Sequence, residues 1–115
     1  FQYFLLTVAD TTISLSAIND TVNFYINQID DKNSKANIYD IYSSVLMTRN
    51  ADYNKILNAI DSSLKYNPNN ALTLNNKAYY LSIDSTKLNE AEKIAQKAIE
   101  MDPNQISCID TYAWI

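Results

Sequence analysis

The sequence predicts an all-α fold built from antiparallel helix pairs that stack as a repeat. Three observations predict it. None of the 115 residues is glycine, which disfavours the tight primed turns of β-hairpins. Apolar residues recur at the spacing of one helix face, and the surroundings of Pro68 recur at Pro103, 35 residues later. A fixed period of this length is typical of helical solenoids, in which neighbouring units bury each other's apolar faces.

The 35-residue shift aligns residues of one kind along the chain. Residues 66–70, which read YNPNN, recur as residues 101–105, which read MDPNQ. A small side chain occupies three of the four aligned positions Val8, Ser43, Ala78 and Ala113. Large side chains fall into three aligned sets: Phe4, Tyr39, Leu74 and Ile109; Ile18, Tyr53 and Leu88; and Ile29, Leu64 and Ile99.

The periodicity predicts helices at about residues 1–12, 17–30, 36–48, 52–66, 71–83, 87–101 and 105–115. The opening segment is apolar but short, lacks a basic leader and is followed by Asp10. It therefore predicts neither a signal peptide nor a membrane-spanning helix. Since the chain begins with Phe1 and stops inside an apolar stretch at Ile115, we expect it to be part of a longer protein.

The later helices have both apolar stripes and capping residues. One stripe is Tyr53, Ile56, Leu57, Ile60 and Leu64, and the next is Leu88, Ala91, Ala95, Ala98 and Ile99. Asn69 or Asn70 is expected to cap the helix over 71–83, because its side-chain oxygen accepts from the first free amides. Asp84, with Ser85 and Thr86 after it, offers the same chemistry before 87–101, and Asn50 offers it before 52–66.

Composition disfavours several kinds of site. Histidine is absent, so Ser-His and Cys-His nucleophilic centres and His-based metal sites are excluded. Cys108 is the only cysteine, and its apolar helical position favours a small core residue over a reactive thiol. Asp30 and Asp31 are the only adjacent carboxylates and are expected to be solvated at a helix end. With net charge −4 and scattered basic residues, we expect no nucleic-acid site, cofactor, metal or catalysis.

The residues 71–105 have the most specific pattern. Leu74, Ala78 and Leu81 are followed by Leu88, Ala91, Ala98 and Pro103. This pattern resembles the tetratricopeptide repeat, and the run IDTYAWI over residues 109–115 resembles the opening of a further unit in bacterial members of the Bacteroides group. The resemblance implies an A helix and a B helix in each unit, a right-handed superhelix, and a concave groove lined by A helices.

The resemblance divides the chain, taken as a single domain 1–115, into a degenerate repeat 1–35, a repeat 36–70, the best-matching repeat 71–105, and the first helix of a further repeat, 106–115. Ile56 and Ser63 replace alanine in the second repeat. In the first, Val8 stands at a small-residue position and Asn33 stands where proline is usual.

The resemblance also implies which stripe of each A helix faces the groove. In order, the stripes are Gln2, Leu5, Ala9 and Thr12; Asn37, Asp40, Ser44 and Met47; Leu72, Asn75, Tyr79 and Ser82; and Ser107, Asp110 and Trp114. From these we expect a protein-binding groove formed by Asp40, Ser44, Met47, Asn75, Tyr79, Asp110 and Trp114. The alternative for Tyr79 and Trp114 is that they only pack against adjoining units.

These residues predict a non-catalytic scaffold that binds a protein or peptide segment. No lysine or arginine lies on the groove stripes, so the subtype that clamps an acidic tail is excluded, and a neutral or basic segment is favoured. The alternatives are a structural repeat spacer within a larger multidomain protein, or a catalytic domain outside this chain. The resemblance favours the bacterial cell envelope over the cytoplasm.

Overall fold

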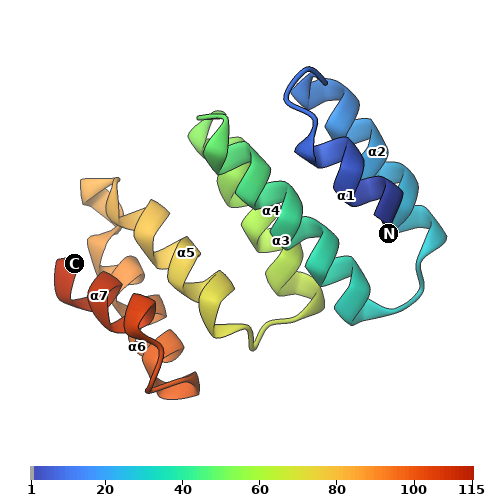
Figure 1. Cartoon of the computed structure of the whole chain (residues 1–115). Coiled ribbons are helices and arrows are strands. Elements are labelled where there is room, and N and C mark those ends of the chain that lie inside the picture. The colour runs from blue at the N-terminus through green and yellow to red at the C-terminus, as the bar shows by residue number, and fades with distance from the viewer. Residues whose placement is uncertain (1) are drawn as a thin grey trace. The chain divides into compact units, whose positions relative to one another are not determined.

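The computed structural model of the protein is all-helical, without a strand, over the residues that it describes (Figure 1). It describes the backbone of residues 2–115, and the side chains of these residues except Gln2, Tyr3, Leu6 and Thr7. The predicted groove position Gln2 therefore lies outside the described side chains. The helices are α1 (Gln2–Ala9), α2 (Leu15–Gln28), α3 (Lys32–Thr48), α4 (Tyr53–Tyr66), α5 (Ala71–Ser82), the 3₁₀ turn η1 (Ser85–Lys87), α6 (Leu88–Met101) and α7 (Ile106–Trp114).

The chain forms two compact units, Phe1–Tyr66 and Asn67–Ile115. In the first unit α3 packs along α4, and α2 packs on both α1 and α3. The core there is built around Phe4, Ile18, Val22 and Ile38. In the second unit α5 packs along α6, and α7 packs on both.

Burial repeats at the 35-residue shift. Helices α4 and α6 begin and end at positions 35 residues apart. Five aligned pairs in α3–α4 and α5–α6 are each at most 3% exposed: Ser43 and Ala78, Leu46 and Leu81, Ile56 and Ala91, Ile60 and Ala95, and Ser63 and Ala98. The predicted helical-repeat organisation is therefore confirmed for these two helix pairs.

Local caps shift the first helix boundaries from the predicted ones. The Asp10 carboxylate accepts hydrogen bonds from the Thr12 amide (2.9 Å) and hydroxyl (2.6 Å), and this turn ends α1 at residue 9 instead of near 12. The Ser14 hydroxyl accepts from the Ala17 amide at 3.1 Å, so α2 begins two residues earlier than predicted.

Asp31 caps α3. Its carboxylate accepts from the Ser34 amide at 2.9 Å and the Ser34 hydroxyl at 2.8 Å. Helix α3 therefore begins at Lys32, four residues before the predicted start at 36. These hydrogen bonds lower the pKa of the Asp31 carboxyl below its ordinary value of 3.8. Asp31 is exposed, as predicted, and its role is to fix the start of the helix.

Asn50 ends a helix and does not begin the next. Its φ of 53° is left-handed, its amide donates to the Met47 carbonyl at 3.1 Å, and the following amide of Ala51 donates to the Leu46 carbonyl at 2.9 Å. Glycine usually occupies such a helix ending. In a chain without glycine, asparagine takes this position because its short polar side chain tolerates the left-handed conformation better than most.

Two predicted caps are confirmed. The Asn70 side-chain oxygen accepts from the amides of Leu72 (3.1 Å) and Thr73 (3.2 Å) at the start of α5. The Asp84 carboxylate accepts from the Thr86 amide at 2.9 Å and starts η1.

Cys108 is a core residue, as predicted. It is fully buried in α7 and its sulfur lies 3.7 Å from the Ala71 carbonyl oxygen. Burial, with a smaller contribution from Asp102, raises the pKa of its thiol. The thiol therefore stays protonated at neutral pH and behaves as a small apolar group.

Three aligned positions are less buried than their equivalents. Ile109 is 44% exposed and Ala113 is exposed, whereas the equivalent Leu74 and Ala78 are buried. The reason is that α6 packs along α5 on that side, while no helix of the described chain covers the same side of α7. Leu88, 41% exposed, is the first residue of α6.

Candidate protein-binding faces

The predicted groove residues are divided between the two units. Asp40, Ser44 and Met47 lie on α3 in the first unit. In the second unit Asn75 and Tyr79 lie on α5, and Asp110 and Trp114 lie on α7. Each unit is therefore described separately.

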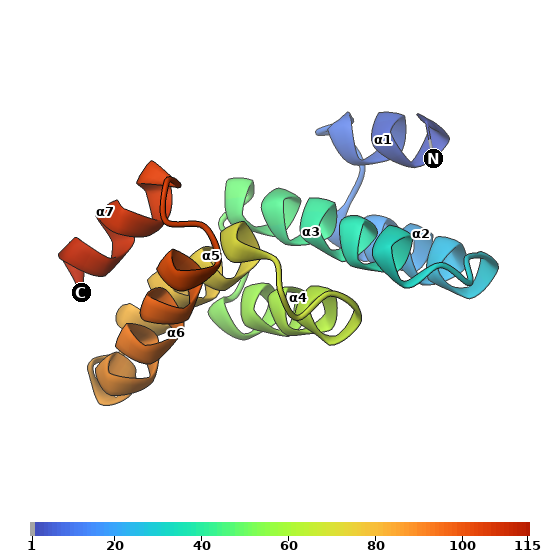
Figure 2. The ribbon, with the colours of Figure 1, turned by 90° about the horizontal axis from the view of Figure 1, so that it is seen from below.

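The second unit presents two large aromatic side chains to solvent. Tyr79 is 46% exposed and Trp114 is 78% exposed. Helices α5 and α7 pack on each other and run side by side in the same direction in both views (Figures 1 and 2). Because the 35-residue shift relates the two helices, Trp114 occupies the repeat position of Tyr79, and Asp110 occupies that of Asn75. Within the described unit, neither aromatic ring is buried by a neighbouring helix.

Asn75 differs from the rest of its stripe because it is buried. Only 8% of the residue is exposed, and its side-chain oxygen makes no hydrogen bond with the described chain. An unpaired buried acceptor costs about 1–3 kcal/mol relative to a paired one. Asp110, which occupies the same repeat position in α7, is exposed and presents its carboxylate to solvent.

The Asp40 carboxylate is engaged inside the first unit. The hydroxyl of Ser63, on α4, lies 2.7 Å from Asp40 Oδ1 and 3.0 Å from the Ala36 carbonyl oxygen. Ser63 is buried and Asp40 is partly buried. Asp40 thus joins α3 to α4, whereas Asp110 at the equivalent position is exposed. The same repeat position therefore holds a carboxylate that joins two helices in the first unit and an exposed carboxylate in the second.

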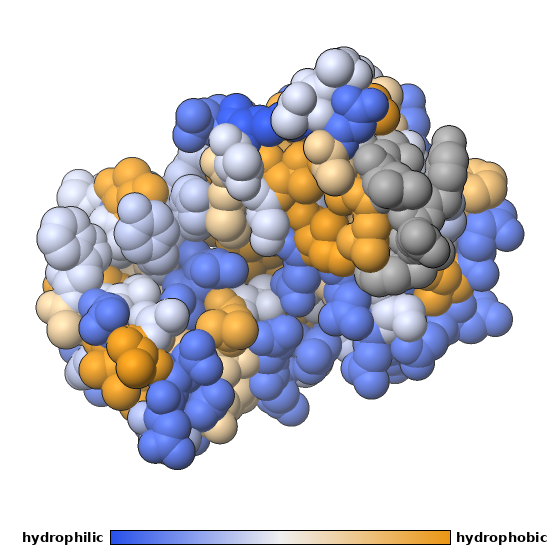
Figure 3. Space-filling model, viewed as in Figure 1, coloured by the Kyte–Doolittle hydropathy of each residue, from blue (hydrophilic) through white to orange (hydrophobic). Residues whose placement is uncertain are grey.

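An apolar pocket, defined by Val8, Ala9, Thr11, Ile41, Ser44, Val45, Thr48 and Arg49, lies between the end of α1 and α3 in the first unit. Its volume is about 380 Å³. Figure 3 shows hydrophobic side chains gathered over these two helices. Sequence reasoning placed Ala9 and Ser44 on the groove face and missed Ile41 and Val45. Their spacing of four residues, with Ser44 between them, was the available signal.

Arg49 borders this pocket and ties two parts of the first unit together. Its guanidinium donates to the carbonyl oxygens of Ile13 and, at 2.8 Å, Asp10. These contacts attach the α1–α2 connection to the end of α3. The pKa of the Asp10 carboxyl is lowered mainly by the hydrogen bonds from Thr12, with a smaller effect of Arg49.

Met47, the remaining predicted groove residue, is partly buried on α3. It does not line the apolar pocket. Ser44 is exposed, and its hydroxyl donates to the Asp40 main-chain oxygen at 3.1 Å. Such back-bonding within a helix leaves the serine with little free hydrogen-bonding capacity as a donor.

No protein-family model matches this sequence, and no curated protein matches it. Among the described residues, none of the helices has the length and apolarity needed to cross a membrane. The side chains described also include no group of three or more Asp, Glu or Cys residues arranged to hold a metal ion.

Proposed function

We propose that this chain is a tetratricopeptide-type helical-repeat scaffold that binds a protein segment and has no catalytic role. The binding face in the second unit consists of Tyr79, Asp110 and Trp114, which we call the α5/α7 face. One observation supports it above the others: Tyr79 and Trp114 occupy the same repeat position on adjacent parallel helices, and both remain exposed.

The chemistry of the α5/α7 face suits an extended or helical segment. Aromatic side chains supply large apolar areas with few rotatable bonds, which is why tyrosine and tryptophan are common at the energetic centre of interfaces. The Asp110 carboxylate favours a lysine or arginine of the partner. A shallow face buries little area and the segment must become ordered, so we expect a dissociation constant near about 1 μM. Added salt should weaken the interaction.

The repeat assignment is supported by three buried positions that recur at the 35-residue shift, two of which hold small residues in both units. Ala78, Ala91 and Ala98 are all fully buried in the second unit, at positions where the tetratricopeptide repeat has small residues. The equivalent positions of the first unit hold Ser43, Ile56 and Ser63, which are also buried. The right-handed superhelix with A helices on its concave side is part of the proposal.

A second candidate function is that of a structural repeat spacer. Ile106 and Ile109 on α7 are 71% and 44% exposed. Ile109 and Ala113 occupy positions whose equivalents in α5, Leu74 and Ala78, are buried. A further helix packed on this side of α7 would bury these residues, and such a helix would extend the repeat without requiring a ligand on the α5/α7 face.

Affinity capture with the full-length protein, followed by mass spectrometry, would identify partners, and a synthetic segment of the leading partner would then be titrated by calorimetry. We expect Tyr79→Ala to weaken binding at least about tenfold, as for an interface hot spot, and Asp110→Lys to weaken binding of a basic segment. Phe24→Ala is the matched aromatic control, since Phe24 is 59% exposed on α2. Glu92→Lys, on an exposed position of α6, is the charge control.

The two candidate functions give different results. If both test variants remain folded and bind as tightly as the parent, the α5/α7 face is not the binding site. If no segment binds while a chain extended by the following helix gains stability and buries Trp114, the spacer is favoured. Quenching of the Trp114 fluorescence by iodide measures that burial.

A further inference from the structure

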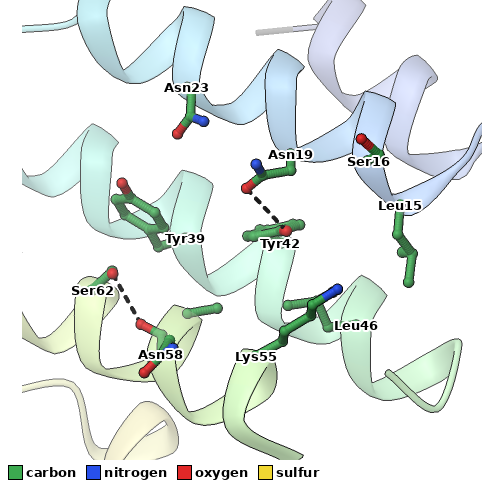
Figure 4. Close-up of a pocket in the computed structure, with 11 residues that line it drawn as sticks. Leu15, Ser16, Asn19, Asn23, Tyr39, Tyr42, Leu46, Lys55, Asn58 and Ser62 are labelled. Atoms are coloured by element: carbon green, nitrogen blue, oxygen red, sulfur yellow. Dashed lines mark hydrogen bonds between the residues drawn. The ribbon is translucent and has the colours of Figure 1, made fainter. Parts of the chain in front are cut away.

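A polar groove lies in the first unit between α2 and α4, with α3 as its floor (Figure 4). Its volume is about 440 Å³, within the usual range of ligand sites. The two walls have matching rows of polar side chains at the same helical spacing, i, i+3 and i+7: Ser16, Asn19 and Asn23 on α2, and Lys55, Asn58 and Ser62 on α4.

The floor of the polar groove repeats the spacing with larger side chains. Tyr39, Tyr42 and Leu46 line it from α3, and the close-up shows the tyrosines between the two polar walls (Figure 4). The Tyr39 ring stacks on Tyr66 with centroids 6.1 Å apart and 5° between the planes. This contact with the end of α4 holds the Tyr39 ring in place, and the floor offers flat apolar surface.

The walls have hydrogen-bonding capacity that the chain does not use. The Tyr42 hydroxyl donates to the Asn19 side-chain oxygen at 3.2 Å, which leaves the Asn19 NH₂ group available as a donor. The side-chain amides of Asn23 and Asn58 make no hydrogen bond within the described part of the chain. An asparagine amide has both a donor and an acceptor, so it matches the C=O and N–H of a peptide unit.

The spacing also matches a main chain. Two residues four apart on a helix are roughly 6 Å apart along its axis, and two residues of an extended chain span roughly 6.6 Å. Asn19 and Asn23 on one wall, and Asn58 on the other, can therefore contact peptide units at this spacing. The Ser62 hydroxyl donates to the Asn58 main-chain oxygen at 2.9 Å, so Ser62 contributes to the groove as an acceptor. From i to i+7 the walls extend roughly 10 Å, the length of about three extended residues.

Charge identifies one further feature of the ligand. Lys55 is the only charged residue that lines the polar groove, and no carboxylate lines it. We propose that the polar groove binds a short extended peptide through its main chain, with an acidic side chain beside Lys55. This site lies on α2, α3 and α4, whereas the α5/α7 face belongs to the other unit and favours a basic segment, so either site can fail without the other.

Three blocked pentapeptides test the proposal: acetyl-Ala-Ala-Glu-Ala-Ala-amide, the same peptide with Lys in place of Glu, and the Glu peptide N-methylated at alternate residues. Each is titrated into the ¹⁵N-labelled chain, and the side-chain amide resonances of Asn19, Asn23 and Asn58 are followed by NMR. We expect the Glu peptide to shift these resonances with a dissociation constant near about 1 mM, since few groups are contacted. The N-methylated and Lys peptides should bind at least about fivefold more weakly, as expected for loss of one net hydrogen bond or charge contact.

Variants separate the groove from the rest of the surface. Asn58→Ala and Lys55→Glu should each weaken the Glu peptide at least about fivefold, and both positions are exposed, so the fold should persist. Asn54→Ala is the matched control, because Asn54 is exposed on α4 and does not line the groove. The proposal is overturned if the Glu peptide shifts none of the three asparagines, if the N-methylated peptide binds equally well, or if Asn54→Ala has the same effect as Asn58→Ala. Shifts from a small polyol such as glycerol, without shifts from the Glu peptide, would assign the groove to another ligand class and equally overturn it.

Discussion

Ala78→Leu tests the packing on which the repeat depends. Ala78 is fully buried on α5, and α5 packs along α6, whose buried residues are Ala91, Ala95 and Ala98. The facing helix α6 is thus lined by small side chains, and leucine adds three carbon atoms to a site on α5 with no exposed surface. Full accommodation of these carbons would contribute about 2.4 kcal/mol of favourable burial. We expect steric strain to outweigh it, with a net loss of about 1–3 kcal/mol.

The expected loss converts to a shift in the melting temperature. A chain of 115 residues has an unfolding entropy of about 0.24 kcal/mol/K, from about 2.1 cal/mol/K per residue. A loss of about 1–3 kcal/mol therefore lowers the melting temperature by roughly 4–12 °C. Circular dichroism at 222 nm follows the transition, and urea unfolding gives the free energy directly.

Ala113→Leu is the matched control for Ala78→Leu. Ala113 lies at the same repeat position, 35 residues later, but is exposed on α7. Its change to leucine should alter stability by less than about 0.5 kcal/mol. If the two variants melt at the same temperature as the parent, the close approach of α5 and α6 does not depend on a small residue at position 78, and the packing argument is wrong.

Three further predictions concern single contacts. Ser63→Ala should destabilise the chain by about 1–2 kcal/mol in urea unfolding, because the buried hydroxyl donates to Asp40 or the Ala36 carbonyl. An equal loss in the Asp40→Ala background would show that the hydrogen bond between Ser63 and Asp40 contributes nothing. Asn50→Ala should cost about 1 kcal/mol and Asn50→Gly almost nothing, since φ is 53°; equal melting temperatures would contradict the left-handed ending. The Asp31 pKa is lowered in the folded state, so the stabilisation from its carboxylate is present above pH 3.8 and is lost as pH falls through the lower pKa of the folded state. Asp31→Asn should flatten the decline of the urea midpoint in this acid range. An unchanged decline would exclude the charged Asp31 cap as its cause.

The sequence by itself determined the helical class and the period. Local features are sufficient for the helical class: a 3.6-residue apolar stripe specifies a helix face, and Asn70 and Asp84 cap their helices with amides two or three residues along the chain. The period follows from the recurrence of residues 66–70 at residues 101–105. The burial of Ala78 and Ala98 was also predictable, because a small residue repeated at one shift, with Ser43 and Ser63 at the equivalent positions, marks a close helix crossing. The stripes and caps depend on residues within a few positions of each other, and the period is a recurrence along the sequence, so both can be recognised without tertiary information.

The start and the end of α3 required the three-dimensional structure, because each lies beside residues that can cap a helix in more than one way. Asp30 and Asp31 are adjacent, and only the structure shows that Asp31 accepts from Ser34 and sets the start of α3. Asn50 precedes α4 in the sequence, which predicted a helix start, but its left-handed φ ends α3. Asparagine is favoured in both roles, so its identity alone does not distinguish them.

The candidate sites depended most on tertiary structure. Asp40 and Asp110 share a repeat position, yet Asp40 is engaged by Ser63 from α4 while Asp110 is exposed. The equivalent of Ser63 in the second unit is Ala98, which has no hydroxyl to donate. The polar groove brings together residues 16–23, 39–46 and 55–62, which no periodicity along one helix relates. The period specifies which side of each helix is buried, whereas contacts between helices determine which polar groups remain available to a ligand.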